Sequence, residues 1–111
     1  MEMIDALSAF EALGQPTRLA VFRLLVQAGP HAAGDIARTL DVRPNTLSTH
    51  LALLVQSGLV TALRRGRSIQ YGADMQGLRA LIAWLLHDCC GGKPETCGPI
   101  LDLIICEETH V

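Results

Sequence analysis

Aromatic residues are scarce in this sequence, and it has no long uninterrupted apolar run. Only 4% of the residues are Phe, Trp or Tyr while 50% are hydrophobic, so a core must consist mostly of aliphatic side chains. Polar residues and Gly58 interrupt the longest uncharged run, residues 44–63, which excludes a membrane span. Glu2 and Asp5 stand where a secretory signal peptide needs basic residues. We therefore expect a cytoplasmic protein that binds no membrane and whose thiols stay reduced.

The length of the chain limits its function as well. A chain of 111 residues provides one small domain, which is too little for a barrel enzyme or a Rossmann unit with a partner domain. No acid–base pair, phosphate-binding loop or nucleophile–base motif is recognisable. We therefore expect neither an enzyme nor an organic cofactor. Because a core of this size is marginal by itself, a homodimer is expected.

The net charge of −2 conceals a segregation of charge along the chain. Residues 31–73 carry five arginines against two aspartates, a local charge of +3, whereas residues 74–111 have a local charge of −4. An anionic partner is expected to bind the basic centre of the chain. The negative total argues against indiscriminate nucleic-acid binding and is compatible with a local DNA-binding face.

The spacing of apolar residues predicts four helices in the first half of the chain. Glycine and proline residues interrupt the pattern where these helices are expected to begin or end. In the fourth helix, Leu47, Leu51 and Leu54 share the side that faces the core, and the opposite side is short, polar and uncharged. The four predicted helices span about residues 3–13, 16–29, 33–40 and 44–57.

A hairpin and a last helix are predicted after the fourth helix. Residues 59–63 and 68–71 are β-capable and flank a glycine turn that is rich in arginine. Asp74 is a suitable N-cap for a long helix. The apolar stripe of that helix is too large for one small core to cover, which predicts a dimer interface formed by Leu78, Leu81, Ile82 and Leu85.

A helix, a tight turn, a second helix and a basic hairpin follow one another in the order of a winged helix-turn-helix. A polar helix face can present hydrogen-bonding side chains to base edges in the major groove. Arginines on a hairpin can reach phosphates or an adjacent minor groove, although by themselves they could equally keep the hairpin soluble. We therefore predict a mainly α fold with a small β-hairpin wing, which binds double-stranded DNA as a dimer.

Several motifs in this order resemble the ArsR/SmtB family of metalloregulators. Leu13–Leu19 (LGQPTRL) and Phe22–Leu25 resemble the opening signature of that family. Asn45–Leu51 (NTLSTHL), Ser57–Val60 and Arg65–Arg67 resemble later parts of it. The resemblance covers about residues 7–90. It implies a homodimer paired through the first and last helices, and transcriptional repression that a metal or metalloid relieves.

The resemblance also implies which residues bind DNA. The recognition helix corresponds to residues 44–57. For His50, a helix-edge residue bonded locally is an equally good interpretation, and for Arg18 a structural role at the surface is favoured. The implied DNA-binding residues are Asn45, Thr46, Ser48, Thr49 and His50, together with Arg64, Arg65 and Arg67 of the wing.

Familiar sensor sites of the family are absent or incomplete in this sequence. Residues 36–40 have no cysteine where the arsenic type of the family carries Cys-Val-Cys. Of the Asp, His and Glu ligands that zinc sensors carry on the last helix, only His87 and Asp88 have counterparts. The N-terminal cysteine of the cadmium/lead pattern is absent too. Four cysteines remain as candidate ligands: Cys89, Cys90, Cys97 and Cys106.

Trivalent arsenic matches these cysteines best. As(III) is soft and prefers three thiolates in a pyramid, and softness selects thiolate over imidazole or carboxylate. A C-terminal cluster of this kind also resembles that of a subset of arsenic-responsive family members. We predict that As(III) or Sb(III) binds Cys89, Cys90 and Cys97 and acts as the inducer. Cys106 lies in an apolar run and is a less suitable ligand.

Other interpretations of the cysteines stay open. A structural or sensory zinc or cadmium site could use them, although the usual C-x-x-C pairs are lacking. A thiol-redox switch is also open, although Cys89 and Cys90 end a helix, where the dipole disfavours thiolate. Cys89 could also be a small core residue, because it continues the apolar stripe of the last helix.

The predicted organisation has two parts. Residues 1–90 are expected to form the DNA-binding and dimerisation domain, and residues 91–111 a tail that completes the metalloid site. Two competing functions are a small thiol enzyme or metalloid carrier, and a protein-interaction domain that keeps the fold without binding DNA. The carrier hypothesis gives the wing arginines and the polar helix face no role.

Overall fold

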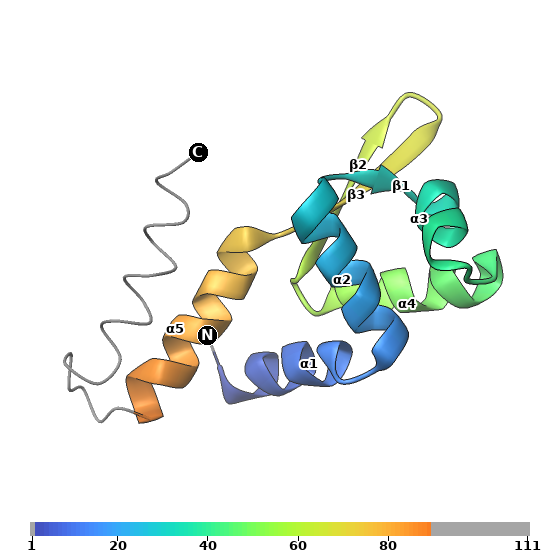
Figure 1. Ribbon diagram of the computed structural model, residues 1–111. Helices are drawn as coiled ribbons and strands as arrows, with labels where there is room; N and C mark the ends of the chain where they lie inside the picture. The colour runs from blue at the N-terminus through green and yellow to red at the C-terminus, as the bar shows by residue number, and fades with distance from the viewer. Residues whose placement is uncertain (1, 90–111) are drawn as a thin grey trace. The chain divides into compact units, whose positions relative to one another are not determined.

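The computed structural model describes residues 2–89, with side chains described for residues 2–86. Residues 2–75 form one compact unit and the last helix belongs to another, so each is described by itself. The helices and the two strands of the hairpin agree with the sequence prediction to within about two residues at their ends, which confirms the mainly α winged helix-turn-helix fold (Figure 1). They are α1 (Met3–Leu13), α2 (Pro16–Ala28), β1 (His31–Ala32), α3 (Ala33–Leu40), α4 (Pro44–Gln56), β2 (Val60–Arg65), β3 (Ser68–Ala73) and α5 (Met75–Cys89).

Helix α4 is the central element of the first unit. It packs against α1, α2, α3 and β2. The side chains of Leu47, Leu51 and Leu54 are buried, as their spacing predicts. They lie in one core with Val21 and Ile36, which are completely buried as well. The aliphatic side chains expected from the composition therefore form the centre of this unit.

The turn between α3 and α4 depends on one residue in an unusual conformation. Asp41 ends α3 with φ 54° and ψ 52°, in the left-handed region, and the N–H of Val42 donates to the carbonyl of Ala37. Aspartate visits this region more easily than most residues with a Cβ atom. Pro44 then occupies the first turn of α4, where its missing N–H costs no helical hydrogen bond.

The sheet contains a strand that the sequence did not reveal. The strand order is β1-β3-β2 and both pairings are antiparallel. β1 has only two residues, His31 paired with Tyr71 and Ala32 paired with Gln70. A two-residue strand without β-branched side chains has no local signature, and its pairing with β3 defines it. At the other end Gly66, with φ 62°, allows the two-residue turn that joins β2 to β3.

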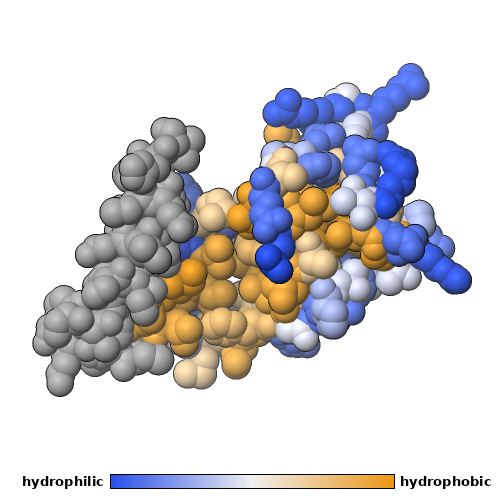
Figure 2. All heavy atoms as spheres, viewed as in Figure 1, coloured by the Kyte–Doolittle hydropathy of each residue, from blue (hydrophilic) through white to orange (hydrophobic). Residues whose placement is uncertain are grey.

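Helix α1 buries its small residues and exposes its large ones. Ala6, Ala9 and Ala12 are buried, whereas Ile4 is 79% and Leu7 60% exposed. The large apolar side chains of α1, among them Ile4, Leu7 and Phe10, therefore form a stripe that faces away from the core of their own unit. Figure 2 shows hydrophobic side chains gathered over this helix.

Helix α5 begins directly after Asp74, the predicted N-cap. Among the four leucine and isoleucine residues predicted for a dimer interface, Leu81 is buried and Leu85 is exposed, while Leu78 and Ile82 are half-buried. The predicted boundary between residues 90 and 91 falls outside the described residues. None of the described helices combines the length and the apolar character that crossing a membrane requires.

The first prediction concerns the core beneath α4. Leu54→Ala should lower the free energy of unfolding by about 3 kcal/mol, because truncating a completely buried leucine leaves a cavity. Leu53→Ala is the matched control, since Leu53 is 40% exposed on the same helix and should cost well under half as much. Urea denaturation followed by circular dichroism measures both. Equal losses in the two variants would contradict the assignment of the buried face.

Candidate nucleic-acid interface

The outer face of α4 is polar, exposed and uncharged. Because Leu47, Leu51 and Leu54 face inward, the helical period turns Asn45, Thr46, Ser48 and Thr49 outward, and all four are exposed. These side chains combine donors and acceptors without a fixed charge. Such a face suits hydrogen bonding to base edges more than general attraction to phosphate.

Two hydroxyl groups on this face are already donating to the helix. The Ser48 Oγ donates to the carbonyl of Pro44 at 3.0 Å and the Thr49 Oγ1 to the carbonyl of Asn45 at 3.5 Å. Their oxygen lone pairs remain as acceptors for a donor on an incoming base. The side chain of Asn45 supplies both a donor and an acceptor.

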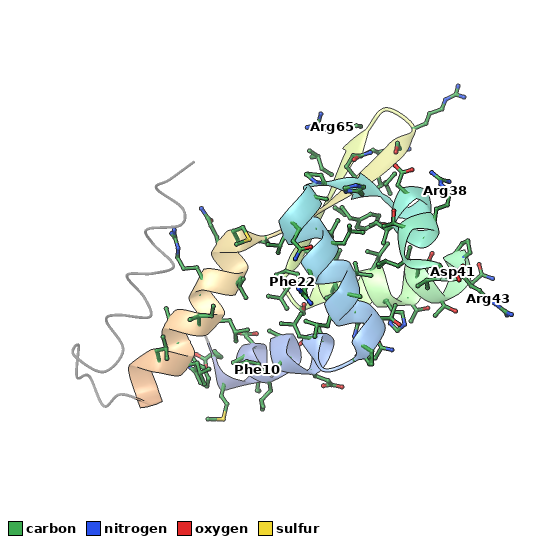
Figure 3. All side chains as sticks on the ribbon, viewed as in Figure 1. Phe10, Phe22, Arg38, Asp41, Arg43 and Arg65 are labelled. Carbon is green, nitrogen blue, oxygen red and sulfur yellow. The ribbon has the colours of Figure 1, made fainter. Side chains whose placement is uncertain are left out.

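Arg43 is a further candidate for contact with DNA. In the sequence it is only one of the five arginines of the basic centre, residues 31–73. It is exposed and occupies the N-cap position of α4, and no acidic residue lies in the first turn of that helix. The positive end of the helix dipole and the guanidinium group both attract anions. This end of α4 is therefore suited to bind a phosphate group. Figure 3 shows Arg43 and Arg38 projecting outward near the turn between α3 and α4. Arg38 is paired with Asp35, which leaves Arg43 as the better candidate.

The wing presents its arginines at the end of the hairpin. Arg64, Arg65 and Arg67 are all exposed. The Arg64 Nε donates to the carbonyl of Gly66 at 3.3 Å, so this guanidinium group is held at its own turn. Arg65 borders a shallow hollow of about 430 Å³ on the hairpin, which Leu63 and Gln70 also line. Because β2 packs directly against α4, the hairpin is fixed relative to the outer face of that helix.

His50 lies at the edge of this face and is bonded within the protein. It is half-buried, and its Nδ1 lies 3.3 Å from the Nη1 of Arg18. Burial lowers the pKa of His50 below 6.5, and the positive charge of Arg18 lowers it further. The locally bonded interpretation of His50 is thus realised. A contact between His50 and DNA stays a prediction.

Arg18 has the structural role that the sequence reasoning favoured. Its Nε donates to the carbonyl of Ala12 at 2.7 Å, and its Nη2 donates to the carbonyl of Glu11 at 3.3 Å. These carbonyls lie at the C-terminal end of α1, where a helix leaves acceptors unsatisfied. The Gln15 side chain accepts from the backbone N–H of Arg18 at 2.8 Å and caps α2.

The predicted metalloid ligands fall outside this part of the molecule. Helix α5 reaches Cys89, whose side chain is not among those described, and Cys90, Cys97 and Cys106 lie outside the described residues. Within residues 2–86, no three His, Cys, Asp or Glu side chains lie close enough together to hold a metal ion.

Comparison with known proteins agrees with the DNA-binding architecture. Residues 13–61 match a family described as a helix-turn-helix domain. The transcriptional repressor SdpR of Bacillus subtilis is 32% identical over 80 residues, which are 72% of this chain and 88% of SdpR. The arsenical resistance operon repressor of Escherichia coli is 32% identical over 71 residues, which are 64% of this chain and 61% of that protein.

Solved structures share the fold as well. An ArsR-like transcriptional regulator from Rhodococcus has a TM-score of 0.72 at 27% identity, covering 90% of this chain and 92% of that chain. A homodimeric winged helix-turn-helix DNA-binding domain from Mycobacterium bovis has a TM-score of 0.65 at 27% identity, covering 78% of this chain and 81% of that chain.

Taken with the exposed polar face of α4 and the basic wing, these likenesses define the class of protein. It is a winged helix-turn-helix transcriptional regulator and not an enzyme. Within that class, the chain belongs to the ArsR/SmtB family, as its motifs predicted.

The second prediction tests the wing. Arg65→Ala and Arg67→Ala should each weaken DNA binding and flatten the slope of log affinity against log salt by about 0.9 for each lost phosphate contact. Arg23→Ala is the matched control, because Arg23 is exposed on α2 and its loss changes the net charge equally. Fluorescence anisotropy across a salt series measures the slope. An unchanged slope in the Arg65/Arg67 double variant would rule out the wing assignment.

Proposed function

We propose that this protein represses transcription by binding operator DNA as a homodimer, and that As(III) or Sb(III) releases it by binding Cys89, Cys90 and Cys97. The exposed, uncharged face of α4 beside a basic wing is the observation that carries the DNA-binding half of this proposal. The similarity to SdpR and to the arsenical resistance operon repressor supports repression. The expected cytoplasmic location accords with such a function.

The exposed stripe of α1 supports a homodimer. Met3, Ile4 and Leu7 are each at least 60% exposed, which is costly for large apolar side chains that lie together on one helix face. Burial against a second copy removes them from water. A two-fold dimer would place two copies of α4 for the two halves of an inverted-repeat operator. The similar domain from Mycobacterium bovis is homodimeric, and the family resemblance implies pairing through the first and last helices.

The third prediction tests this face. Leu7→Glu should shift the protein towards monomer and weaken operator binding, because a carboxylate cannot be buried against the apolar stripe of a second copy. Leu63→Glu is the matched control for oligomeric state, since Leu63 is 56% exposed on the wing rather than on α1. Sedimentation velocity measures the mass of both variants. A Leu7→Glu protein that stays dimeric would exclude α1 from the interface.

The chemistry of arsenic accounts for the proposed inducer. Arsenite enters as As(OH)₃, and each arsenic–sulfur bond forms as a thiol gives its proton to a departing hydroxide, which leaves as water. Three such exchanges consume three thiols, release three water molecules and involve no electron transfer. The thiols need no lowered resting pKa, because the metalloid displaces their protons as it binds.

Release from DNA requires the inducer to distinguish two states of the protein. A nearly complete switch needs about 5.5 kcal/mol of preference for the DNA-free state. Cys89 ends α5, whose apolar stripe includes Leu81 and Leu85. A ligand bound at the end of a helix that helps to pair the subunits can change that pairing, and the change in pairing alters the spacing of the two α4 helices.

The fourth prediction concerns the cysteines. Cys89→Ser, Cys90→Ser and Cys97→Ser should each keep operator binding and lose the response to arsenite, because each removes one thiolate of the proposed set. Cys106→Ser is the matched control and should keep both properties. Operator binding is followed by anisotropy during titration of the reduced protein with arsenite, and the expected stoichiometry is one metalloid per subunit.

The same titration separates the alternatives. Release by zinc or cadmium but not by arsenite would replace the metalloid with a divalent metal, and release by peroxide alone would indicate a redox switch. If the Cys97→Ser protein still leaves DNA at the native arsenite concentration, the three-thiolate set is wrong.

A further inference from the structure

Arg18 joins three helices through one guanidinium group. Two of its nitrogens donate to the carbonyls of Ala12 and Glu11 in α1, and a third lies 3.3 Å from the Nδ1 of His50 in α4. Arg18 itself belongs to α2. Arg18 and His50 are 32 positions apart in the sequence.

A surface groove lies beside this contact. It has a volume of about 100 Å³ and is lined by Ser8, Glu11 and Ala12 of α1 and by Leu53 and Gln56 of α4, with Arg18 at its border. Four of these residues are exposed, so the groove opens to solvent. The contact from Arg18 to His50 is a polar link to α4 at the border of this groove.

The contact also fixes the chemical state of His50. A guanidinium group can only donate, so the Nδ1 of His50 must accept and the ring proton must reside on Nε2. His50 is half-buried on the helix that carries the exposed Ser48 and Thr49, and its Nε2–H group can serve as a donor. Hydrogen-bond donation to a base edge or phosphate needs such a group in a fixed position.

We propose that Arg18 is a positioning residue for DNA reading: it holds His50, and with it the outer face of α4, against the C-terminal end of α1. This inference rests on the proposed DNA-binding function. It assigns Arg18 to sequence discrimination rather than to general affinity, because the guanidinium group is occupied by protein acceptors. Its loss should affect a preferred duplex far more than a scrambled one.

Protonation of His50 should have the same effect as loss of Arg18. A protonated ring cannot accept at Nδ1, and it sets a second cation beside the guanidinium group. Arg18 in α2 is the charged group that acts on His50, whereas Glu11 of α1 lines the groove that Arg18 borders and the outer face of α4 is uncharged. The pKa of His50 lies below 6.5, so discrimination should be complete at neutral pH and decline as the pH falls through that pKa.

The experiment compares affinities for two probes: a duplex that the native protein selects from a randomised pool, and a scrambled duplex of the same composition. Arg18→Met and His50→Ala should each lower the ratio of the two affinities about fivefold, as expected for loss of one hydrogen bond. Because Arg18 acts through His50, the double variant should lose no more than either single variant. Arg23→Met is the matched control, and it should change both affinities equally and leave their ratio intact.

A pH profile tests the same inference without relying on the Arg18 variant to fold. As the pH is lowered from neutral to well below 6.5, through the lowered pKa of His50, the affinity ratio of the native protein should fall, while that of His50→Ala should stay flat. Additive losses in the double variant, an unchanged ratio in a folded Arg18→Met protein, or a flat native profile would each overturn the proposal. A native protein that selects no duplex would instead overturn the proposed function, on which this inference depends.

Discussion

The burial of one face of α4 is the constraint on which the rest of the structure depends. Leu47, Leu51 and Leu54 are almost completely buried, and they contribute to the core together with residues of α2 and α3. A helix is a stiff rod with a fixed angular period, so fixing its inner face also fixes its outer face. The polar residues at positions 45, 46, 48 and 49 are thereby held outward on a rigid support. A DNA-reading surface needs this rigidity more than it needs any single contact.

Helix α1 packs through small residues instead of leucines. Three alanines let α1 approach its neighbours closely, but they bury little apolar surface. The larger side chains of α1 are left in water, and an open groove lies between α1 and α4. Arg18 makes polar contacts at that junction. The proposed dimer would cover the exposed stripe of α1. The alanine face of α1 would then serve folding, and the opposite face would serve dimer formation.

Charge is distributed to match these roles. The chain is slightly acidic in total, yet Arg43 at the start of α4 and the wing arginines are all exposed. These groups can attract phosphate from two elements, while the uncharged face of α4 lies with them in the same unit. General attraction and sequence reading are therefore separated onto different side chains.

Local chemistry in the sequence determined the helices, the leucine stripe of α4 and the hairpin, because a period of 3.6, a first-turn proline or a glycine turn needs no distant partner. It also carried the family motifs, and with them the candidate DNA contacts and the proposed cysteine site. Tertiary structure alone determined four features. They are the existence of strand β1, the outward direction of the apolar stripe of α1, the position of Arg43 at the start of α4, and the partner of His50. Each depends on residues that meet only after the chain has folded. Arg18 and His50, 32 positions apart, show the reason: no local pattern records which side chain will face which across a helix junction.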